Sequence, residues 1–208
     1  MTELNEGILM KTLDYCYERS VNGLPGLETA EELARNYLSG CGSTEVKAKR
    51  LVNIQVAKAG VSGFVTGIGG IITLPVAIPA NLASILYLQI RMIAAVAAMG
   101  GHDIRTDEIK SLVYLCLCGS ASANIMKDLG LLITNTQMAS AVRGISRVTI
   151  TKINQAVGFR LLTRFGRGGL VNIAKAAPLV GGIIGGIVDA ITTKASGKFA
   201  INYFLRNS

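Results

Sequence analysis

The chain has 208 residues, of which 50% are hydrophobic and only 16% are charged, so it can build a sizeable core and is not a disordered chain. Tryptophan is absent and glycine is abundant, with 24 residues, which favours closely packed helices. The net charge of +8 is uneven, because residues 1–45 carry eight acids and three bases whereas residues 46–208 carry five acids and eighteen bases. This basic body is expected to attract an anionic membrane surface or nucleic acid, although a merely solvated basic surface would explain it equally well.

The first ten residues, MTELNEGILM, contain acids and lack a basic segment before an apolar core. They do not resemble a signal peptide, and they predict a cytoplasmic protein. Four cysteines, Cys16, Cys41, Cys116 and Cys118, accompany a single histidine, His102. This set lacks the spacing of a zinc site, so we predict no metal and interpret the Cys116 and Cys118 pair as small buried residues in a reducing compartment.

Three amphipathic helices are predicted in the N-terminal part of the chain. The first covers residues 4–20, where apolar side chains recur at helical spacing. The second follows Thr29, which forms a capping-box pattern with Glu32. The third begins after a cap at Ser43 or Thr44.

Residues 59–99 include thirty-two consecutive uncharged residues before Arg91. Pro75 and Pro79 break this segment into two arms, which predicts a glycine-rich helical hairpin. The second arm, residues 80–99, is long enough as a helix to span a hydrocarbon core of roughly 30 Å. The hairpin therefore either crosses a bilayer or forms the centre of a soluble helical protein, and we favour the buried hairpin.

In the second half of the chain, a helix is predicted to begin after Thr106, which can cap its N-terminus. Residues 120–155 have a mixed pattern, and the stretch RVTITKI could also be extended. Helices are predicted over residues 156–166 and over a second hydrophobic segment at about 170–193.

These patterns predict an all-α fold, a single-domain helical bundle in which the central hairpin packs against the second hydrophobic helix. The parts of this domain are the amphipathic N-terminal helices (1–58), the hydrophobic hairpin (59–99), the middle helices (100–155), and the basic helix with the glycine-rich C-terminal helices (156–208).

Two charges lie inside apolar segments, Arg91 in the hairpin and Asp189 in the second hydrophobic helix. A lone buried charge is costly, so we expect Arg91 either to pair with an acid such as Asp189 or to face a polar cleft. Gln89 and Asn81 add polar groups to the same helix and complete a candidate buried polar site. A structural pair that sets the helix register is favoured over a functional site.

Glycine spacing predicts close contact between residues 60–70 and residues 181–186. The glycines expected to pack in this way are Gly63, Gly67, Gly181, Gly182, Gly185 and Gly186. The first segment lacks the residues of a phosphate-binding loop, a dinucleotide fingerprint or a nucleophile elbow, so we predict no cofactor. His102, in GGHDIR, is interpreted as part of a turn, and no catalytic residue is assigned.

Arg160, Arg164 and Arg167 follow i, i+4, i+7 spacing and therefore share one helix face, with Phe159 and Leu162 on the other side. This basic amphipathic helix is a candidate anionic-lipid face, and a solvated face is the alternative. Nucleic acid is the least favoured partner, because aromatic interleaving and a helix-turn-helix pattern are missing.

Two long blocks of the chain run from GFVTGIGG to YLCLCG and from NQAVGFRLL to FAINYF, and the segment GLPGLETAEELARNYL precedes them. The two blocks closely resemble the EcsC protein family of bacteria, and the earlier segment resembles the family's entry segment. The resemblance covers roughly residues 10–204. It implies a helical, membrane-associated protein linked to a transporter or an envelope process, and it implies no activity, cofactor or residue role.

Three functions are consistent with these features. The favoured one is a membrane-associated interaction protein of the EcsC type, located at the cytoplasmic side of the inner membrane and bound to anionic lipid. The alternatives are a soluble helical domain that inserts its hairpin to form a pore, and an enzyme with a polar site near Arg91. The sequence identifies neither a protein partner nor an oligomeric state.

Overall fold

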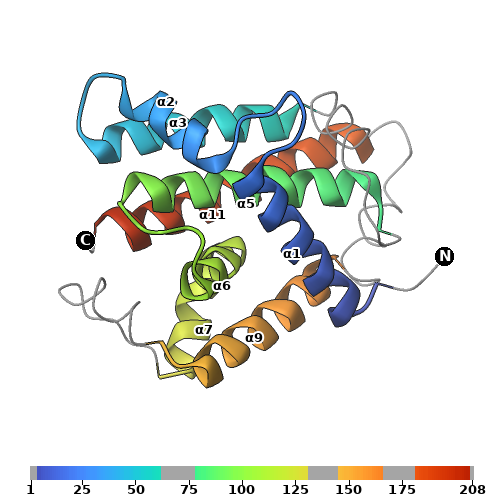
Figure 1. The fold of residues 1–208 in the computed structure, drawn as a ribbon. Helices are drawn as coiled ribbons and strands as arrows, with labels where there is room; N and C mark the ends of the chain where they lie inside the picture. The colour runs from blue at the N-terminus through green and yellow to red at the C-terminus, as the bar shows by residue number, and fades with distance from the viewer. Residues whose placement is uncertain (1–3, 62–77, 131–144, 166–180, 207–208) are drawn as a thin grey trace.

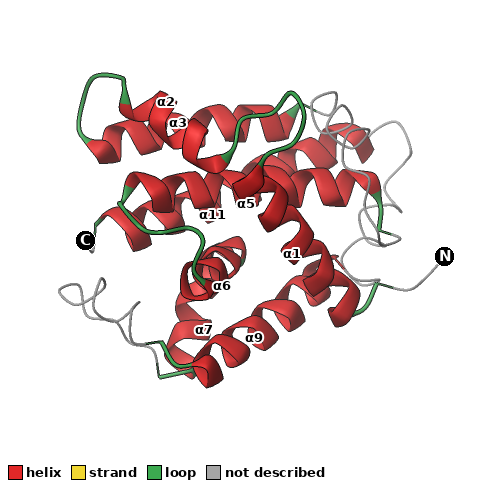
Figure 2. Ribbon diagram, viewed as in Figure 1, coloured by secondary structure: helices red, strands yellow, loops and turns green. Residues whose placement is uncertain are grey.

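The computed structural model describes residues 4–61, 78–130, 145–165 and 181–206 (Figure 1). Within these ranges the chain forms eight α-helices, one short 3₁₀ helix and no strand, which confirms the all-α prediction (Figure 2). The helices are α1 Glu6–Asn22, α2 Ala30–Leu38, α3 Thr44–Gly60, α5 Ala80–Met99, α6 Asp107–Leu117, η1 Gly119–Ala121, α7 Ser122–Asp128, α9 Arg147–Phe165 and α11 Gly181–Leu205.

Side-chain caps set the starts of four helices. Asn5 caps α1, Ser43 caps α3 and Thr106 caps α6, each by accepting a backbone N–H bond from the first turn. The capping box at α2 forms as predicted, because Thr29 and Glu32 each bond the other's backbone N–H. The local sequence therefore determines where these helices begin.

The apolar helix α5 lies at the centre of the fold, in contact with α1, α2, α3, α6 and α11. Figure 1 shows α2 and α3 above it and α9 on the opposite side of the molecule. Every side chain from Leu82 to Met99 except Ala98 is buried. Among the described residues, α5 is long and apolar enough to cross a membrane, but 94% of its apolar window is buried inside the protein, as in a core helix. The second arm of the predicted hairpin is therefore a core helix, and residues 62–77 of the first arm lie outside the described residues.

The helices α3 and α11 pack against each other in antiparallel directions. At one end the backbones of Gly60 and Gly186 meet, so that a Cβ on Gly186 would lie 2.7 Å from the Gly60 carbonyl oxygen. At the other end the Arg206 guanidinium lies 2.6 Å from the Glu45 carboxylate. Glycine at the first contact is what allows the two backbones to approach so closely.

The other predicted packing glycines cannot be placed at this contact. Gly63 and Gly67 lie outside the described residues. For Gly181, Gly182 and Gly185 the structure describes the helix but not the packing.

Two helices differ from the predicted boundaries. The segment RVTITKI is helical and not extended, because it forms the start of α9, which begins at Arg147 rather than at residue 156. Burial of Ile153 in the core offsets the weak helix preference of its β-branched neighbours. The C-terminal helix α11 continues to Leu205, beyond the predicted end near residue 193, because Ala200 and Phe204 are also buried in the core.

Candidate functional site

Arg91 is buried in α5, with only 3% of its surface exposed. Its Nη1 donates a hydrogen bond to the Glu28 carbonyl oxygen at 3.1 Å, and its guanidinium lies 5.5 Å from the centre of the Tyr87 ring. Asp189 lies on α11. Burial raises the pKa of its carboxyl group, and the charge that lowers this pKa is that of Arg164. Arg91 and Asp189 therefore do not form the expected pair. A backbone carbonyl and an aromatic face stabilise the buried guanidinium instead.

The other polar residues of α5 face different surroundings. Gln89 donates from Nε2 to the hydroxyl groups of Thr192 and Thr193, at 3.2 and 3.0 Å, and so joins α5 to α11. Asn81 is exposed near the start of the helix. Residues two positions apart on a helix point about 200° apart, which is why Gln89 and Arg91 reach different neighbours. The four predicted polar residues are not gathered into one site, and Arg91 is too buried to serve as the open polar site that the enzyme hypothesis needs.

His102 joins the ends of two helices. Its Nε2 lies 3.3 Å from the Phe204 carbonyl oxygen, and its ring packs edge-on against the Phe204 ring. Burial lowers the pKa of this imidazole below its ordinary value. Asp103 accepts a hydrogen bond from the Arg105 backbone N–H at 2.9 Å, as in a turn. Within the described ranges, no three histidine, cysteine or acidic side chains gather as metal ligands would.

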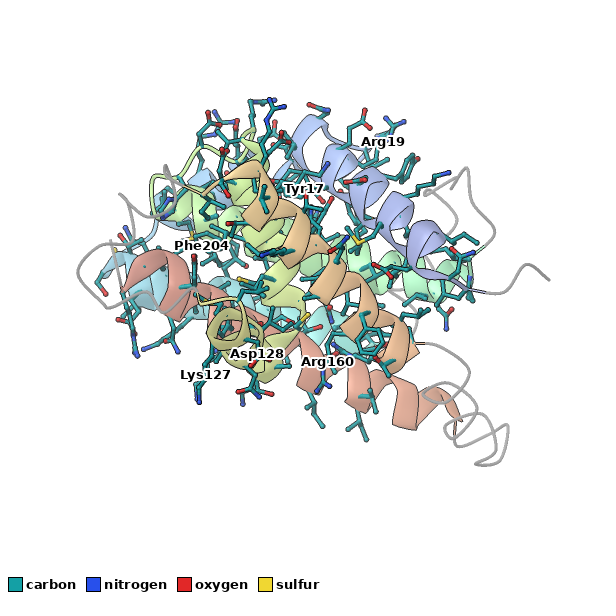
Figure 3. The ribbon with its side chains drawn as sticks, turned by 90° about the horizontal axis from the view of Figure 1, so that it is seen from below. Tyr17, Arg19, Lys127, Asp128, Arg160 and Phe204 are labelled. Carbon is teal, nitrogen blue, oxygen red and sulfur yellow. The ribbon has the colours of Figure 1, made fainter. Side chains whose placement is uncertain are left out.

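The helix α9 has one buried face and one exposed face. Ile153, Val157 and Leu161 are buried, and α9 contacts α1 and α6. Phe159 and Val148 point to solvent, with 68% and 65% of their surfaces exposed. Figure 3 views the molecule from this side, with α9 crossing the front. The outer face of α9 consists of the exposed residues Val148, Lys152, Gln155, Phe159 and Thr163.

Cations surround the outer face of α9. Arg147, Lys152 and Arg160 are exposed along the helix, and the sequence of α9 contains no acid. Glu6 of α1 packs beside Gly158, which is one of the buried residues of α9. The outer face thus combines two exposed apolar side chains with positive charge, the composition of a helix that lies on an anionic membrane.

The predicted basic stripe is divided by the fold. Arg160 is exposed, but Arg164 turns toward the end of α6, where its Nη1 donates to the Leu117 carbonyl oxygen at 3.3 Å. Its guanidinium lies 4.9 Å from the centre of the Phe165 ring, and burial lowers its pKa. Arg164 therefore does not share a solvent-facing stripe with Arg160, because it flanks the buried face of α9. Arg167 lies outside the described residues.

A hollow of about 370 Å³ opens beside α9, next to the segment that joins α6 to α7. Its lining residues are Cys118, Ser120, Ala121, Arg160, Leu161, Thr163 and Arg164. Burial raises the pKa of the Cys118 thiol to about 12, which makes it a poor nucleophile at neutral pH. The lining of the hollow therefore offers two arginine side chains and no reactive thiol.

The model of the EcsC protein family matches residues 10–206. The chain belongs to the EcsC protein family. No curated protein matches the chain, and no solved structure matches it. The family match begins within α1 and includes the whole of every later described helix through α11.

Sequence reasoning missed the outer face of α9 in this EcsC chain, because it placed Phe159 on the apolar side of the helix. A signal was present, since Val148, Lys152 and Phe159 follow helical spacing. A helix that begins at residue 156 is too short to show this periodicity. No sequence pattern of similar strength indicated the hollow beside Arg160, because its lining residues come from two distant parts of the chain.

Proposed function

We propose that this EcsC chain is a peripheral interaction protein that binds an anionic membrane surface through the outer face of α9. The observation that carries this proposal is the exposure of Phe159 on a helix that has three exposed cations and no acid. An exposed phenylalanine gains free energy when it enters the interface between headgroups and acyl chains. Neighbouring cations gain free energy from the negative surface potential of the same membrane.

The expected affinity is low. Full burial of Phe159 is worth roughly 1.5–3 kcal/mol, and each cation near an anionic surface adds about 1 kcal/mol. The apolar gain from Phe159 and the electrostatic gain from the three cations add to about 4.5–6 kcal/mol, which corresponds to a dissociation constant of roughly 0.04–0.5 mM. Such binding is reversible, so stable attachment would require a second contact, such as a protein partner at the membrane. This agrees with an interaction protein better than with a permanently anchored one.

The buried position of α5 favours peripheral binding over a membrane span. A spanning helix would exchange the contacts of α5 with five other helices for contacts with lipid. It would also bring Arg91 from its site beside the Glu28 carbonyl oxygen into the hydrocarbon region, where an arginine is costly. The described fold already buries the apolar surface that would otherwise require a bilayer.

The test is flotation of the purified chain with vesicles of phosphatidylcholine that contain phosphatidylglycerol. We expect the chain to float with these vesicles, and to float less as salt increases, because salt screens the attraction. Phe159→Asp should lower binding at least tenfold, since it removes apolar contact and adds repulsion. The matched control is Ile54→Asp, at an exposed position of α3 on the opposite side of the molecule from α9 (Figure 1). Equal flotation of the two variants, or no flotation of the unmodified chain, would contradict the proposal.

The family resemblance leads us to include a transporter or another envelope machine in this proposal, as the protein partner at the cytoplasmic face of the inner membrane. Cross-linking in intact cells, followed by identification of the linked proteins, tests this part. Recovery of the chain only in the soluble fraction, without a membrane protein attached, would argue against it.

A second candidate is conditional insertion of α5 to form a pore. The observation in its favour is the length and apolar composition of α5, which suffice to cross a bilayer. Dye release from anionic vesicles over a range of pH tests insertion directly. Flotation without dye release at any pH would support peripheral binding and exclude the pore.

A further inference from the structure

We propose that the hollow beside α9 is a binding site for a phosphoryl group, held by the guanidinium groups of Arg160 and Arg164. Both arginines line the hollow and lie one turn apart on the same helix. Planar guanidinium groups bind phosphate oxygens in pairs, and two of them can share the charge of one phosphate monoester. The chemical class of ligand is therefore a phosphate monoester, either on a lipid headgroup or in solution.

The size and lining of the hollow fit this ligand. A volume of about 370 Å³ accommodates a phosphoryl group with a small organic portion. The hydroxyl groups of Ser120 and Thr163 also line the hollow and add polar contacts. Leu161 and Ala121 form an apolar part of the wall that suits a carbon chain or a glycerol backbone.

The charge inside the hollow is incompletely balanced by the protein. Arg160 and Arg164 repel each other at this spacing, and burial lowers the pKa of Arg164. The acid that acts on Arg164 is Asp189, but the two side chains are not within ion-pair distance among the described residues. Burial also raises the pKa of the Asp189 carboxyl group above its ordinary value. A bound dianion would supply the missing negative charge.

The position of the hollow relates it to the membrane face. Arg160 is exposed, and it lies next to Phe159 of the outer face on one side while lining the hollow on the other. Figure 3 shows Arg160 on α9 in the view from this side. With Phe159 in the interface, Arg160 would lie near the level of the lipid phosphates. Binding of a phosphoryl group on a lipid therefore rests on the proposed membrane-binding function. Binding of a soluble phosphate ester does not.

The experiment uses the full chain and titrates it with inorganic phosphate and with glycerol 3-phosphate at constant ionic strength, followed by calorimetry. We expect saturable binding of glycerol 3-phosphate. Arg160→Gln should weaken it at least tenfold, and because this side chain is exposed the variant should fold normally. Lys11→Gln is the matched control, since it removes one exposed positive charge, on α1, without lining the hollow, and it should leave binding unchanged. Arg164→Lys keeps the charge but loses the planar geometry, and should weaken binding as well.

A second experiment, with vesicles, distinguishes a lipid headgroup from a soluble phosphate ester as the ligand. Stronger flotation with phosphatidic acid than with phosphatidylglycerol at equal surface charge, lost in Arg160→Gln, assigns the site to a lipid headgroup. Equal flotation with saturable binding of glycerol 3-phosphate assigns it to a soluble ligand. If Phe159→Asp floats normally while Arg160→Gln loses phosphate binding, the proposed membrane face is wrong and the phosphoryl site stands. No saturable binding of either phosphate compound, or equal binding by Arg160→Gln, overturns the site.

Discussion

Gly197 is a position on α11 where an added methyl group has no room. A Cβ there would lie 2.5 and 2.8 Å from the two methyl carbons of Val52 on α3, and 3.3 Å from the Met92 Cε atom of α5. Carbon atoms in contact prefer separations of about 3.5–4.0 Å. We therefore predict that Gly197→Ala destabilises the protein and that shortening Val52 relieves the clash.

The magnitudes follow from the packing. Overpacking costs about 1–3 kcal/mol, while the better helix propensity of alanine returns about 1 kcal/mol, so Gly197→Ala should lower the free energy of unfolding by up to about 2 kcal/mol. Val52 is 5% exposed, and Val52→Ala removes two buried methyl groups at about 0.8 kcal/mol each, or about 2 kcal/mol with the cavity included. In the double variant the methyl group added at position 197 occupies part of the space that the valine side chain vacates. The double variant should therefore be about 1–2 kcal/mol more stable than the sum of the two single destabilisations predicts.

The assay is urea unfolding followed by far-UV circular dichroism for the four members of the double-mutant cycle. Gly7→Ala serves as the control, because a Cβ on this other helical glycine would make an ordinary contact of 3.4 Å with the Asn5 side chain. It should be neutral or slightly stabilising. If the two single changes add within about 0.5 kcal/mol, the close packing of α11 on α3 is refuted.

Three further predictions concern charged groups. Arg91→Ala should lower the free energy of unfolding by about 2 kcal/mol in urea titrations, because the Glu28 carbonyl loses a charged donor and the buried Arg91 side chain is no longer there to fill its site. Arg91→Met should cost less because it keeps the packing, and equal losses would contradict this account. Hydrogen bonds from Arg206 and a neighbouring lysine lower the pKa of Glu45 to about 2, so its stabilising effect is present above the unfolded pKa of about 4.3 and is lost as the pH falls toward 2. Melting temperatures of Glu45→Gln should therefore fall less steeply than those of the unmodified chain over this range, and parallel curves would count against the ion pair. The lowered pKa of His102 means that the unfolded chain binds a proton more readily, so stability should decline as the pH falls below about 6.5, and His102→Gln should remove this decline in the same measurement.

Much of the fold could be predicted from local sequence. The capping box of Thr29 and Glu32 and the cap at Thr106 mark helix starts that the structure confirms, because a cap depends on a few adjacent residues. The long apolar run of residues 80–99 is a helix, as its composition requires. The blocks that resemble the EcsC family lie within the region that the family model matches.

The candidate site was predicted less well, and α9 shows why. Helical spacing gives the angle between two side chains, but it does not say which side of the helix its neighbours will cover. Apolar residues occur on both sides of α9, so the spacing alone could not decide between Phe159 and Leu161 as the buried residue. Contact with α1 and α6 buries Leu161 and leaves Phe159 exposed.

By itself the sequence determined the all-α class, several helix starts and family membership, because these depend on short-range patterns and on long ordered blocks. Only the tertiary structure decided the surroundings of the charged groups. It placed Arg91 against the Glu28 carbonyl oxygen rather than beside Asp189, and it turned Arg164 toward the end of α6. The physical reason is that the stability of a buried charge depends on the groups that other helices bring to it, and those groups come from distant parts of the chain.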